Sequence, residues 1–481
     1  MSKIVLFANT DWYLYNFRRS LALALREAGH ELLLLSPPGE YGARLRALGL
    51  RWEPVPMDRR SLNPLREAAV LAHLWRLFRR ERPDLVHGFT IKCAVYGSLA
   101  ARLAGVPARV NAVTGMGYVF TSTDAKARAL RPLVRLLMRA ALDGRDARLI
   151  LQNPDDVAVF EQARLVAPGQ IRLIPGSGVD CVRFAPGGPG RARGDVGDVG
   201  GGRRGRGPDL RETPHPDVRG HAPNTSVGHV GPTYDTIATV GRGHYDTIAT
   251  VGRGHYDTIA TVGRGHAPDV RGHAPDIDTP THPVGRGHPP DNAAAPPPFR
   301  VLLAARLLWD KGLAEFIDAA RRLHGEGRAI DFLLAGDPDP GNPAAVPEAT
   351  VNGWVDEGLL QWLGHVDDMP ALLRSVDVAV LPSYREGLPK GLIEAAACGL
   401  PLVTTDVPGC REVVADGIDG LRVPVRDAAA LAAAIARLHD DPALASRLGA
   451  AARTRALAEF DEQIVIARTL AVYREVLPGD R

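Results

Sequence analysis

The sequence predicts an α/β protein made of two doubly wound, Rossmann-like domains. Apolar runs of strand length alternate with amphipathic stretches of helix length, and this alternation occurs twice, in residues 1–186 and 299–460. A stretch of different composition, residues 187–298, separates the two. Strands that alternate with helices are typical of parallel sheets with helical crossovers. A chain of 481 residues is also long enough for two or three domains with their own cores.

The first domain, residues 1–186, contains several apolar runs that predict buried strands. Amphipathic stretches such as 18–28 and 95–104 lie between them and predict crossover helices. The predicted strands are Ile4–Ala8, Glu31–Leu35, Leu85–His87, Arg109–Val113, Arg148–Leu151 and Ile171–Ile174.

The second domain, residues 299–460, repeats the scheme. A helix predicted over 461–476 could cross back to the first domain, so residues 461–481 are assigned to that crossing segment. Two such domains favour a cleft between them, and ligands of open α/β sheets bind outside the carboxyl ends of the strands. We therefore expect the chemistry to face that cleft. The predicted strands are Arg300–Ala304, Asp331–Ala335, Val378–Leu381, Leu400–Thr404 and Leu421–Val423.

Residues 187–298 are predicted to be a disordered repeat insertion. The unit Tyr-Asp-Thr-Ile-Ala-Thr-Val-Gly-Arg-Gly-His occurs three times without change, at 234–244, 245–255 and 256–266. A short solenoid is the alternative, but each unit is too small and polar to bury a face. Metal binding by the histidines of this segment is a second alternative, although no tight ligand cluster recurs. Such a loop adds only about 2 kcal/mol of closure entropy, so both domains could fold around it.

Composition and charge narrow the class of protein. The four cysteines show neither metal nor redox spacing, which favours a reduced, cytoplasmic setting, and no signal peptide or membrane-spanning run is recognised. Residues 1–186 hold 27 Lys and Arg against 16 Asp and Glu (+11), whereas residues 299–481 hold 19 against 27 (−8). The basic excess lies in 59–82 and 126–148, and it suits either an anionic membrane surface or ordinary solvated helix faces. No nucleic-acid motif accompanies it, so nucleic acid is not an expected partner.

The most informative motif is residues 384–394, Tyr-Arg-Glu-Gly-Leu-Pro-Lys-Gly-Leu-Ile-Glu. A strand-like run precedes it and a small-residue helix follows, so Glu386 is expected in the loop and Glu394 within the helix. Such a loop presents backbone N–H groups and a helix N-terminus to an anion. A phosphate held between two carboxylates that bind hydroxyls would suit a nucleotide-sugar.

Two cations open the second domain at a predicted junction of strand and helix. Arg306 follows the first strand and Lys311 stands five residues later. Cations in this position suit a pyrophosphate, on which charge accumulates as a sugar departs.

These residues resemble the signature of the retaining GT-B glycosyltransferases of family 4. Further stretches resemble the bacterial branch that acts in capsule, O-antigen lipopolysaccharide and lipid-linked oligosaccharide assembly. The resemblance covers roughly residues 1–186 and 299–475. The further matching stretches are Asp84–Gly88, Val113–Phe120, Gln152–Asp156, Ile174–Asp180, Leu334–Asp337, Leu381–Gly387 and Thr405–Glu412.

The resemblance implies a nucleotide-sugar donor, usually a UDP-sugar, held mainly by the second domain. Arg306 and Lys311 would neutralise the donor pyrophosphate, and Glu386 would contact hydroxyls of the transferred sugar. Glu394 would accept hydrogen bonds from the ribose. The resemblance thus implies donor-binding roles for all four residues.

Further residues take implied roles around the phosphate and the acceptor. The backbone N–H groups of Gly387 and Leu388 would help to hold a phosphate. His87 would stand at the end of a strand, near the sugar and the attacking hydroxyl. Arg18 and Lys92 are weaker candidates for contacts with an acceptor phosphate.

The mechanism that the resemblance implies is front-face attack with retention, in which the leaving phosphate takes the acceptor proton. His87, Glu386, Arg306 and Lys311 would form the catalytic set. No metal or other cofactor is expected, because the spacing Asp337-Pro-Asp339 matches a family loop without a metal role.

One loop departs from the family pattern. Many relatives carry a Gly-Gly pair after the first strand, whereas this chain has residues 9–18, Asn-Thr-Asp-Trp-Tyr-Leu-Tyr-Asn-Phe-Arg. This departure puts an approach of the donor phosphate to the loop in doubt. Its aromatic side chains could stack on an acceptor sugar, touch lipid, or pack locally.

Our main hypothesis is therefore a cytoplasmic glycosyltransferase at the inner face of the membrane, acting on a polyprenyl-diphosphate-linked saccharide. The alternatives are a nucleotide-sugar epimerase or soluble sugar transferase on the same fold, and a non-catalytic protein that binds sugar nucleotides.

Overall fold

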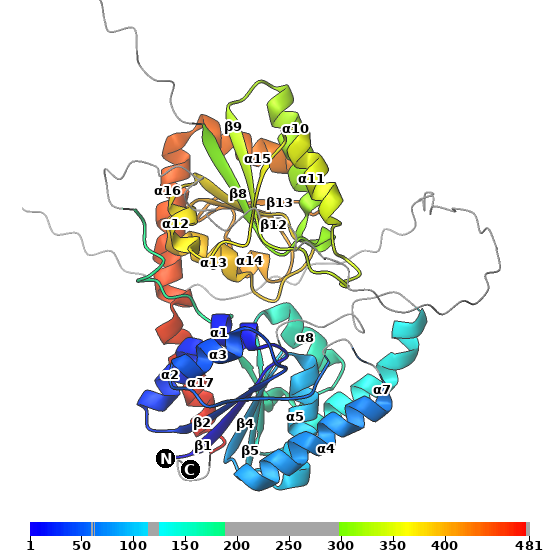
Figure 1. Cartoon of the computed structure of the whole chain (residues 1–481). Coiled ribbons are helices and arrows are strands. Elements are labelled where there is room, and N and C mark those ends of the chain that lie inside the picture. Colours follow the sequence, from blue (N-terminus) through cyan, green and yellow to red (C-terminus); the bar gives the residue numbers. More distant parts are fainter. Residues whose placement is uncertain (59–60, 62, 114–124, 188–297, 478–481) are drawn as a thin grey trace, which may run out of the picture. The chain divides into compact units, whose positions relative to one another are not determined.

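The computed structural model describes residues 1–58, 61, 63–113, 125–187 and 298–477, and it confirms the predicted α/β class (Figure 1). Its two parallel sheets, of seven and six strands, are flanked by helices. The repeat segment that we predicted to be disordered lies outside these ranges, as does most of the motif at 113–120.

The first sheet has the strand order β3-β2-β1-β4-β5-β6-β7, and every described pair in it is parallel. The direction in which strands are added reverses between β1 and β4, which pair from Ile4–Leu85 to Phe7–Gly88. The strands are β1 (Lys3–Phe7), β2 (Glu31–Ser36), β3 (Trp52–Pro54), β4 (Leu85–Phe89), β5 (Ala108–Ala112), β6 (Ala147–Leu151) and β7 (Ile171–Leu173).

Helices of the first domain begin where the sequence provides caps. Asn63 and Asn153 each accept a hydrogen bond from a backbone N–H of the first turn, and each is followed by a proline at the first helical position. Both features favour a helix start. The helices are α1 (Asp11–Phe17), α2 (Arg19–Glu27), α3 (Tyr41–Ala47), α4 (Pro64–Glu81), α5 (Ile91–Ala104), α7 (Ala125–Leu142) and α8 (Pro154–Gln162).

Both faces of the first sheet are buried, which explains its nearly continuous apolar strands. In β1, Ile4 and Leu6 join the core beneath α2, whereas Val5 and Phe7 join the core beneath α4 and α5. This division follows from the two-residue period of a strand.

The second sheet has the strand order β10-β9-β8-β11-β12-β13, with the reversal between β8 and β11. The strands are β8 (Phe299–Ala304), β9 (Ile330–Ala335), β10 (Gln361–Gly364), β11 (Val378–Leu381), β12 (Leu402–Thr405) and β13 (Leu421–Val423). The helices are α10 (Leu313–Gly325), α11 (Glu348–Asp356), α12 (Met369–Arg374), α13 (Lys390–Ala397), α14 (Cys410–Val413), α15 (Ala428–Asp440) and α16 (Pro442–Arg455).

The last helix, α17 (Glu462–Arg474), packs on the first sheet although it follows the second domain in sequence (Figure 1). Val465 and Tyr473 belong to the same core as β1 and β4. At the start of the helix the Glu462 N–H donates to the Val179 carbonyl oxygen at 3.0 Å, and Gly178 approaches so closely that a Cβ would lie 2.4 Å from Glu462 Cα. Backbone contact therefore fixes where α17 enters the first domain.

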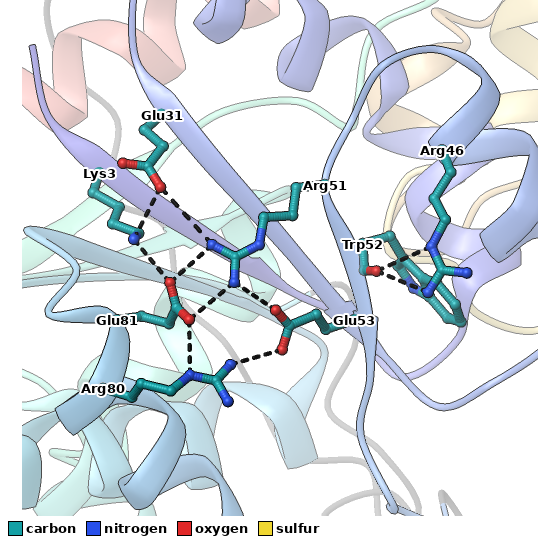
Figure 2. A network of polar contacts seen from close by, with 8 residues as sticks. All are labelled: Lys3, Glu31, Arg46, Arg51, Trp52, Glu53, Arg80 and Glu81. Carbon is teal, nitrogen blue, oxygen red and sulfur yellow. Dashed lines mark hydrogen bonds and ion pairs between the residues drawn. The ribbon is translucent and has the colours of Figure 1, made fainter.

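A network of ion pairs ties the amino ends of β1 and β2 to the C-terminus of α4 (Figure 2). Its centre is Glu81, whose side chain is 8% exposed and accepts from Lys3, Arg51 and Arg80. These cations, Arg51 foremost, hold the pKa of Glu81 well below its usual range. The network lies opposite the carboxyl ends of the strands, so we interpret it as structural.

Two strands were missed by the sequence prediction, β3 and β10. Both lie at an edge of their sheet and are only three and four residues long, so they carry little periodicity. The other predicted strands occur with ends shifted by at most two residues.

Candidate functional site

The site in the second domain is built on the loops that follow β8 and β11. These neighbouring strands mark the reversal of the second sheet, where ligands bind in doubly wound folds. The loop after β8 carries Arg306 and Lys311, and the loop after β11 carries Glu386. The topology therefore brings predicted cations and a predicted carboxylate to one edge of the sheet.

Backbone contacts hold these two loops together. Gly312 has φ +77°, and a Cβ there would lie 2.1 Å from the Pro382 carbonyl oxygen, so only glycine fits. The Asp310 carbonyl oxygen accepts hydrogen bonds from the Tyr384 N–H and the Ser383 hydroxyl, both at 2.9 Å. The relative position of Lys311 and Glu386 is therefore set by the main chain.

Lys311 and Glu386 form an ion pair in which Nζ and Oε1 are 2.5 Å apart. Their side chains are only 15% and 13% exposed, so the pair is poorly screened by water. The Glu386 N–H donates to the Pro408 carbonyl oxygen at 3.1 Å, which fixes the loop from the other side. The structure thus presents a largely buried ammonium group beside a carboxylate that can accept hydrogen bonds from hydroxyl groups.

Unused backbone donors lie directly after Glu386. None of the hydrogen bonds within the described residues uses the N–H of Gly387 or Leu388, and α13 begins at Lys390 without a side-chain cap. The start of α13 therefore offers N–H groups and the positive end of a helix dipole to an anion. This agrees with the expectation that Gly387 and Leu388 contact a phosphate, which stays a prediction.

Glu394 lies in α13 and its side chain is 16% exposed. Burial raises the pKa of this carboxyl, and Lys390, with Nζ 3.5 Å from Oε1, partly offsets that effect. A buried carboxylate that is only partly compensated by cations retains acceptor capacity for ligand hydroxyls.

Arg306 lies two residues beyond the end of β8 with a side chain that is 56% exposed. Its Nη1 donates to Asp339 Oδ2 at 2.7 Å, and Asn342 donates to the same oxygen at 3.0 Å. Asp339 therefore orients Arg306, and the fork of the guanidinium has further donors for a phosphate. The Asp339 of the predicted non-metal loop is thus a partner of Arg306.

The first domain corrects our expectation that His87 ends a strand. β4 continues through Phe89, because the register with β5 runs from Leu85 to Phe89, so His87 is its central residue and is 1% exposed. His87 Nδ1 is hydrogen-bonded to the Tyr473 hydroxyl of α17 at 2.6 Å. Burial, with a smaller effect from Arg18, holds the pKa of His87 well below its usual range, so the imidazole is neutral. Its predicted catalytic role stays a prediction.

The two acceptor candidates lie in different surroundings. Lys92 Nζ donates to the carbonyl oxygens of Asp58 and Ser61 and to Glu67, at 2.6, 3.0 and 3.0 Å. All three ammonium donors are thus in use, and Lys92 could bind a phosphate only by losing one of these partners. Arg18, by contrast, has no carboxylate partner among the described residues.

Contacts around the Glu386 loop were not predicted. Asn153 Nδ2 donates to the Gly387 carbonyl oxygen at 2.8 Å, and Arg385 pairs with Asp156 at 2.6 Å. Tyr384 donates to the Glu315 carboxylate at 2.8 Å. The motif at 152–156 contains Asn153 and Asp156 and was the feature of the sequence that could have pointed to the first two contacts. A motif alone, however, does not identify the residues that it contacts.

Two family models match the chain, one in each domain. "Glycosyl transferase 4-like" matches residues 3–153, and "Glycosyl transferases group 1" matches residues 298–441. The chain belongs to the group 1 glycosyltransferases. For this glycosyltransferase the models together span more than half of the sequence, including Arg306, Lys311, Glu386 and Glu394.

Curated relatives cover the glycosyltransferase to different extents. It is 24% identical over 464 residues to the N,N'-diacetylbacillosaminyl-diphospho-undecaprenol alpha-1,3-N-acetylgalactosaminyltransferase of Campylobacter jejuni, with 96% of both chains covered. It is 25% identical to the UDP-Gal:alpha-D-GlcNAc-diphosphoundecaprenol alpha-1,3-galactosyltransferase of Escherichia coli, over 81% of this chain and 75% of the relative. A glycogen synthase of Mycobacterium tuberculosis is 36% identical, but over only 38% of this chain and 44% of the relative.

Solved structures show the same fold. HepE from Anabaena in complex with UDP and glucose superposes with a TM-score of 0.62 at 17% identity, covering 98% of this chain and all of HepE. The sucrose-phosphate synthase of Thermosynechococcus elongatus gives a TM-score of 0.64 at 18% identity, with 99% of both chains covered. At this identity the likeness shows the GT-B fold alone.

Proposed function

We propose that this glycosyltransferase transfers a sugar from a nucleotide-sugar, a UDP-sugar, to a saccharide linked to a polyprenyl diphosphate, with retention of the anomeric configuration. The observation that carries the donor half is the Lys311–Glu386 pair beside the unused N–H groups of Gly387 and Leu388. Cation, amide donors and carboxylate match a pyrophosphate joined to a sugar with free hydroxyls.

The residues divide the work by their chemistry. Lys311 Nζ and the N–H groups that precede α13 stabilise the charge that develops on the leaving diphosphate, and Arg306 adds a second cation. Glu386 accepts hydrogen bonds from sugar hydroxyls, and Glu394 does so from the ribose. Neither carboxylate acts as a nucleophile in this scheme, because the departing phosphate takes the acceptor proton. No metal enters the proposed reaction.

The acceptor half is supported by the relatives that match over most of their length. The Campylobacter jejuni and Escherichia coli enzymes both carry a diphospho-undecaprenol-linked sugar in their names. Such an acceptor has a lipid tail, which requires the enzyme to work at a membrane surface.

Peripheral attachment to the cytoplasmic face of an anionic membrane is part of the proposal. No helix within the described ranges is long and apolar enough to span a bilayer. Leu136 and Leu137 of α7 are 65% and 39% exposed and lie beside the exposed Arg135 and Arg139. Apolar side chains interleaved with cations suit the interface of an anionic bilayer.

Replacement of Lys311 or Glu386 by alanine tests the proposed function. Transfer from a panel of nucleotide-sugars to membrane-extracted polyprenyl-linked acceptors, followed by mass spectrometry, should fall at least about 100-fold. Lys311→Ala removes a charge that stabilises the leaving diphosphate, and Glu386→Ala removes the acceptor for the hydroxyls of the sugar. Arg321→Ala on the exposed face of α10 is the matched control and should keep full activity.

Circular dichroism should show that the inactive variants stay folded. Full transfer by Lys311→Ala or Glu386→Ala would refute the assignment of the site. Turnover of the donor without an acceptor would indicate an epimerase instead, and transfer to a lipid-free acceptor a soluble enzyme. UDP binding without any turnover would indicate a non-catalytic protein.

A further inference from the structure

Arg18 is a buried cation to which none of the described residues supplies a counter-ion. It joins the end of α1 to the start of α2 and is 5% exposed. Its Nη2 donates to the Tyr13 hydroxyl at 2.9 Å, and its guanidinium lies 4.4 Å from the ring centroid of Phe89. No carboxylate among the described residues pairs with it, and its Nε–H has no partner. Buried arginines normally have an anionic partner, because desolvation of an unpaired charge is costly.

A second unpartnered group lies in the same cluster. The ring centroids of His87 and Phe89 are 4.0 Å apart, and His87 Nε2 is buried without a hydrogen-bond partner among the residues that the structure describes. The Tyr473 hydroxyl is hydrogen-bonded to His87 Nδ1, and no other acceptor for its proton is found among the described residues, so we assign the hydroxyl as the donor and Nδ1 as the acceptor. The neutral imidazole then carries its proton on Nε2. Arg18 Nε and His87 Nε2 are thus both donors in need of an acceptor.

The cluster lies where a ligand is expected on topological grounds. β1 and β4 are the neighbouring strands at which the order of the first sheet reverses, and Arg18 follows the first of them through α1. Ligands of doubly wound sheets bind at this reversal. In addition, α2 begins at Arg19 with no side-chain cap from the described residues, so its first N–H groups and its dipole favour an anion. The Glu462 carboxylate, which accepts from the Ser20 hydroxyl of the same turn at 2.6 Å, is the one described anion there.

We propose that Arg18 and His87, with the N-terminus of α2, form an anion subsite that binds one phosphoryl group of a diphosphate ester. The ligand oxygens accept hydrogen bonds from Arg18 Nε and His87 Nε2. They also accept from Arg18 Nη2, which donates to the Tyr13 hydroxyl in the unliganded protein. A phosphoryl group supplies several acceptor oxygens and the charge that the guanidinium lacks.

We assign this subsite to the diphosphate of the lipid-linked acceptor. The loops after β8 and β11 already hold cations and amide donors for the pyrophosphate of the donor, so a second anion subsite on the other sheet suits the second diphosphate substrate. This assignment of the source rests on the proposed function. The anion subsite itself does not.

Inorganic diphosphate is the probe for the subsite, used with the full-length Lys311→Ala protein so that the second-domain site contributes little. Titration calorimetry should show binding that Arg18→Met weakens at least tenfold. Arg19→Gln, next in sequence and stacked on Tyr15, is the matched control and should bind normally. Without ligand, Arg18→Met should also melt at a higher temperature, because methionine fills the site without an unpaired charge.

Unchanged binding together with a lower melting temperature of Arg18→Met would overturn the subsite and leave Arg18 a structural residue. In transfer assays with Arg18→Met in the otherwise unaltered enzyme, a tenfold rise of the KM for the acceptor with an unchanged KM for the donor supports the assignment of the subsite to the acceptor diphosphate. The opposite pattern would overturn that source in favour of the donor diphosphate. If no transfer occurs with any donor, the proposed function fails, and the diphosphate titration still decides the subsite.

Discussion

At the scale of single residues, the site is a set of charges held in unusual surroundings. Lys311 and Glu386 are 75 positions apart in the sequence and are brought together by adjacent loops. Glu394 is buried, and the nearby Lys390 and Arg183 offset this burial only in part, so its ionised form is less stable than in water. A carboxylate in such surroundings lowers the stability of the unliganded fold, and perturbed groups of this kind are common at functional sites.

Glu394→Gln should stabilise the unliganded protein at neutral pH. Burial raises the pKa of Glu394 in the folded state above the unfolded value of 4.5. Between these two pKa values the folded protein binds more protons than the unfolded chain, so the free energy of unfolding falls as the pH rises. The native carboxyl therefore reduces stability as pH rises through its folded pKa, and has no such effect below 4.5. At pH 8 the variant should melt about 2–4 °C higher, the shift that 1 kcal/mol produces in a domain of this size.

Melting curves at pH 8 and pH 4.5 test this expectation. The difference between Glu394→Gln and the parent protein should vanish at pH 4.5. The exposed Glu161 of α8 is the control, since Glu161→Gln should leave the curves unchanged at both values. A destabilised Glu394→Gln at pH 8 would show that the carboxylate is better solvated than its burial indicates.

Residue types and loop positions were enough to predict part of this site. Lys311 and Glu386 were selected because a charge between a strand and a helix points to an anion or a hydroxyl ligand, and Glu394 because it lies in the helix that follows the same loop; their roles stay predictions. The roles of Asp310, Tyr384 and Asp339 were not, because each depends on a contact between loops that a linear pattern does not encode. His87 was placed at a strand end because the next residue, Gly88, is of a type that is depleted in strands.

At the scale of elements, α17 completes the first domain. Beyond its apolar face, Glu475 at its end accepts from Arg148 and Arg172 at 2.7 and 2.6 Å. Arg172 foremost lowers the pKa of Glu475. The hydroxyl of Tyr473 reaches His87 in the middle of β4. The last helix therefore contacts the strand that carries one of the predicted catalytic residues.

Tyr473→Phe should destabilise the protein by about 1–2 kcal/mol, because it leaves His87 Nδ1 buried without a partner. Urea denaturation followed by circular dichroism measures this change. Tyr15→Phe is the control: its ring packs against Tyr41, and the loss of its hydroxyl should change the free energy of unfolding by only a few tenths of a kcal/mol. An unaltered stability of Tyr473→Phe would mean that water replaces the hydroxyl.

At the scale of the whole molecule, the sequence predicted the two sheets because the alternation of strands and helices is a local pattern. It did not predict the bond between His87 and Tyr473, whose partners are 386 positions apart, because no local pattern specifies such a pair. The order of the strands was not predicted, because two edge strands were missed and no local pattern specifies which strands are neighbours. The surfaces that meet other molecules are harder to predict, since exposure depends on how the helices pack.

Attachment to membranes is the prediction that belongs to this scale. Leu136→Ser with Leu137→Ser should reduce sedimentation with vesicles of anionic phospholipid several-fold, because the apolar part of the proposed interface is lost. Leu173→Ser, which removes a leucine that is 50% exposed on β7, should sediment as the parent does. Equal sedimentation of the double variant and the parent would exclude this face of α7 as the contact.

The crossing of α17 has a consequence for how the protein is made. The ribosome completes β1 to β7 long before it reaches α17, and the apolar surface under Val465 and Tyr473 stays uncovered while the second domain is synthesised. A nascent chain must therefore keep that surface away from other chains, by itself or with a chaperone. The first domain to be synthesised can therefore complete its core only after the second domain has been synthesised.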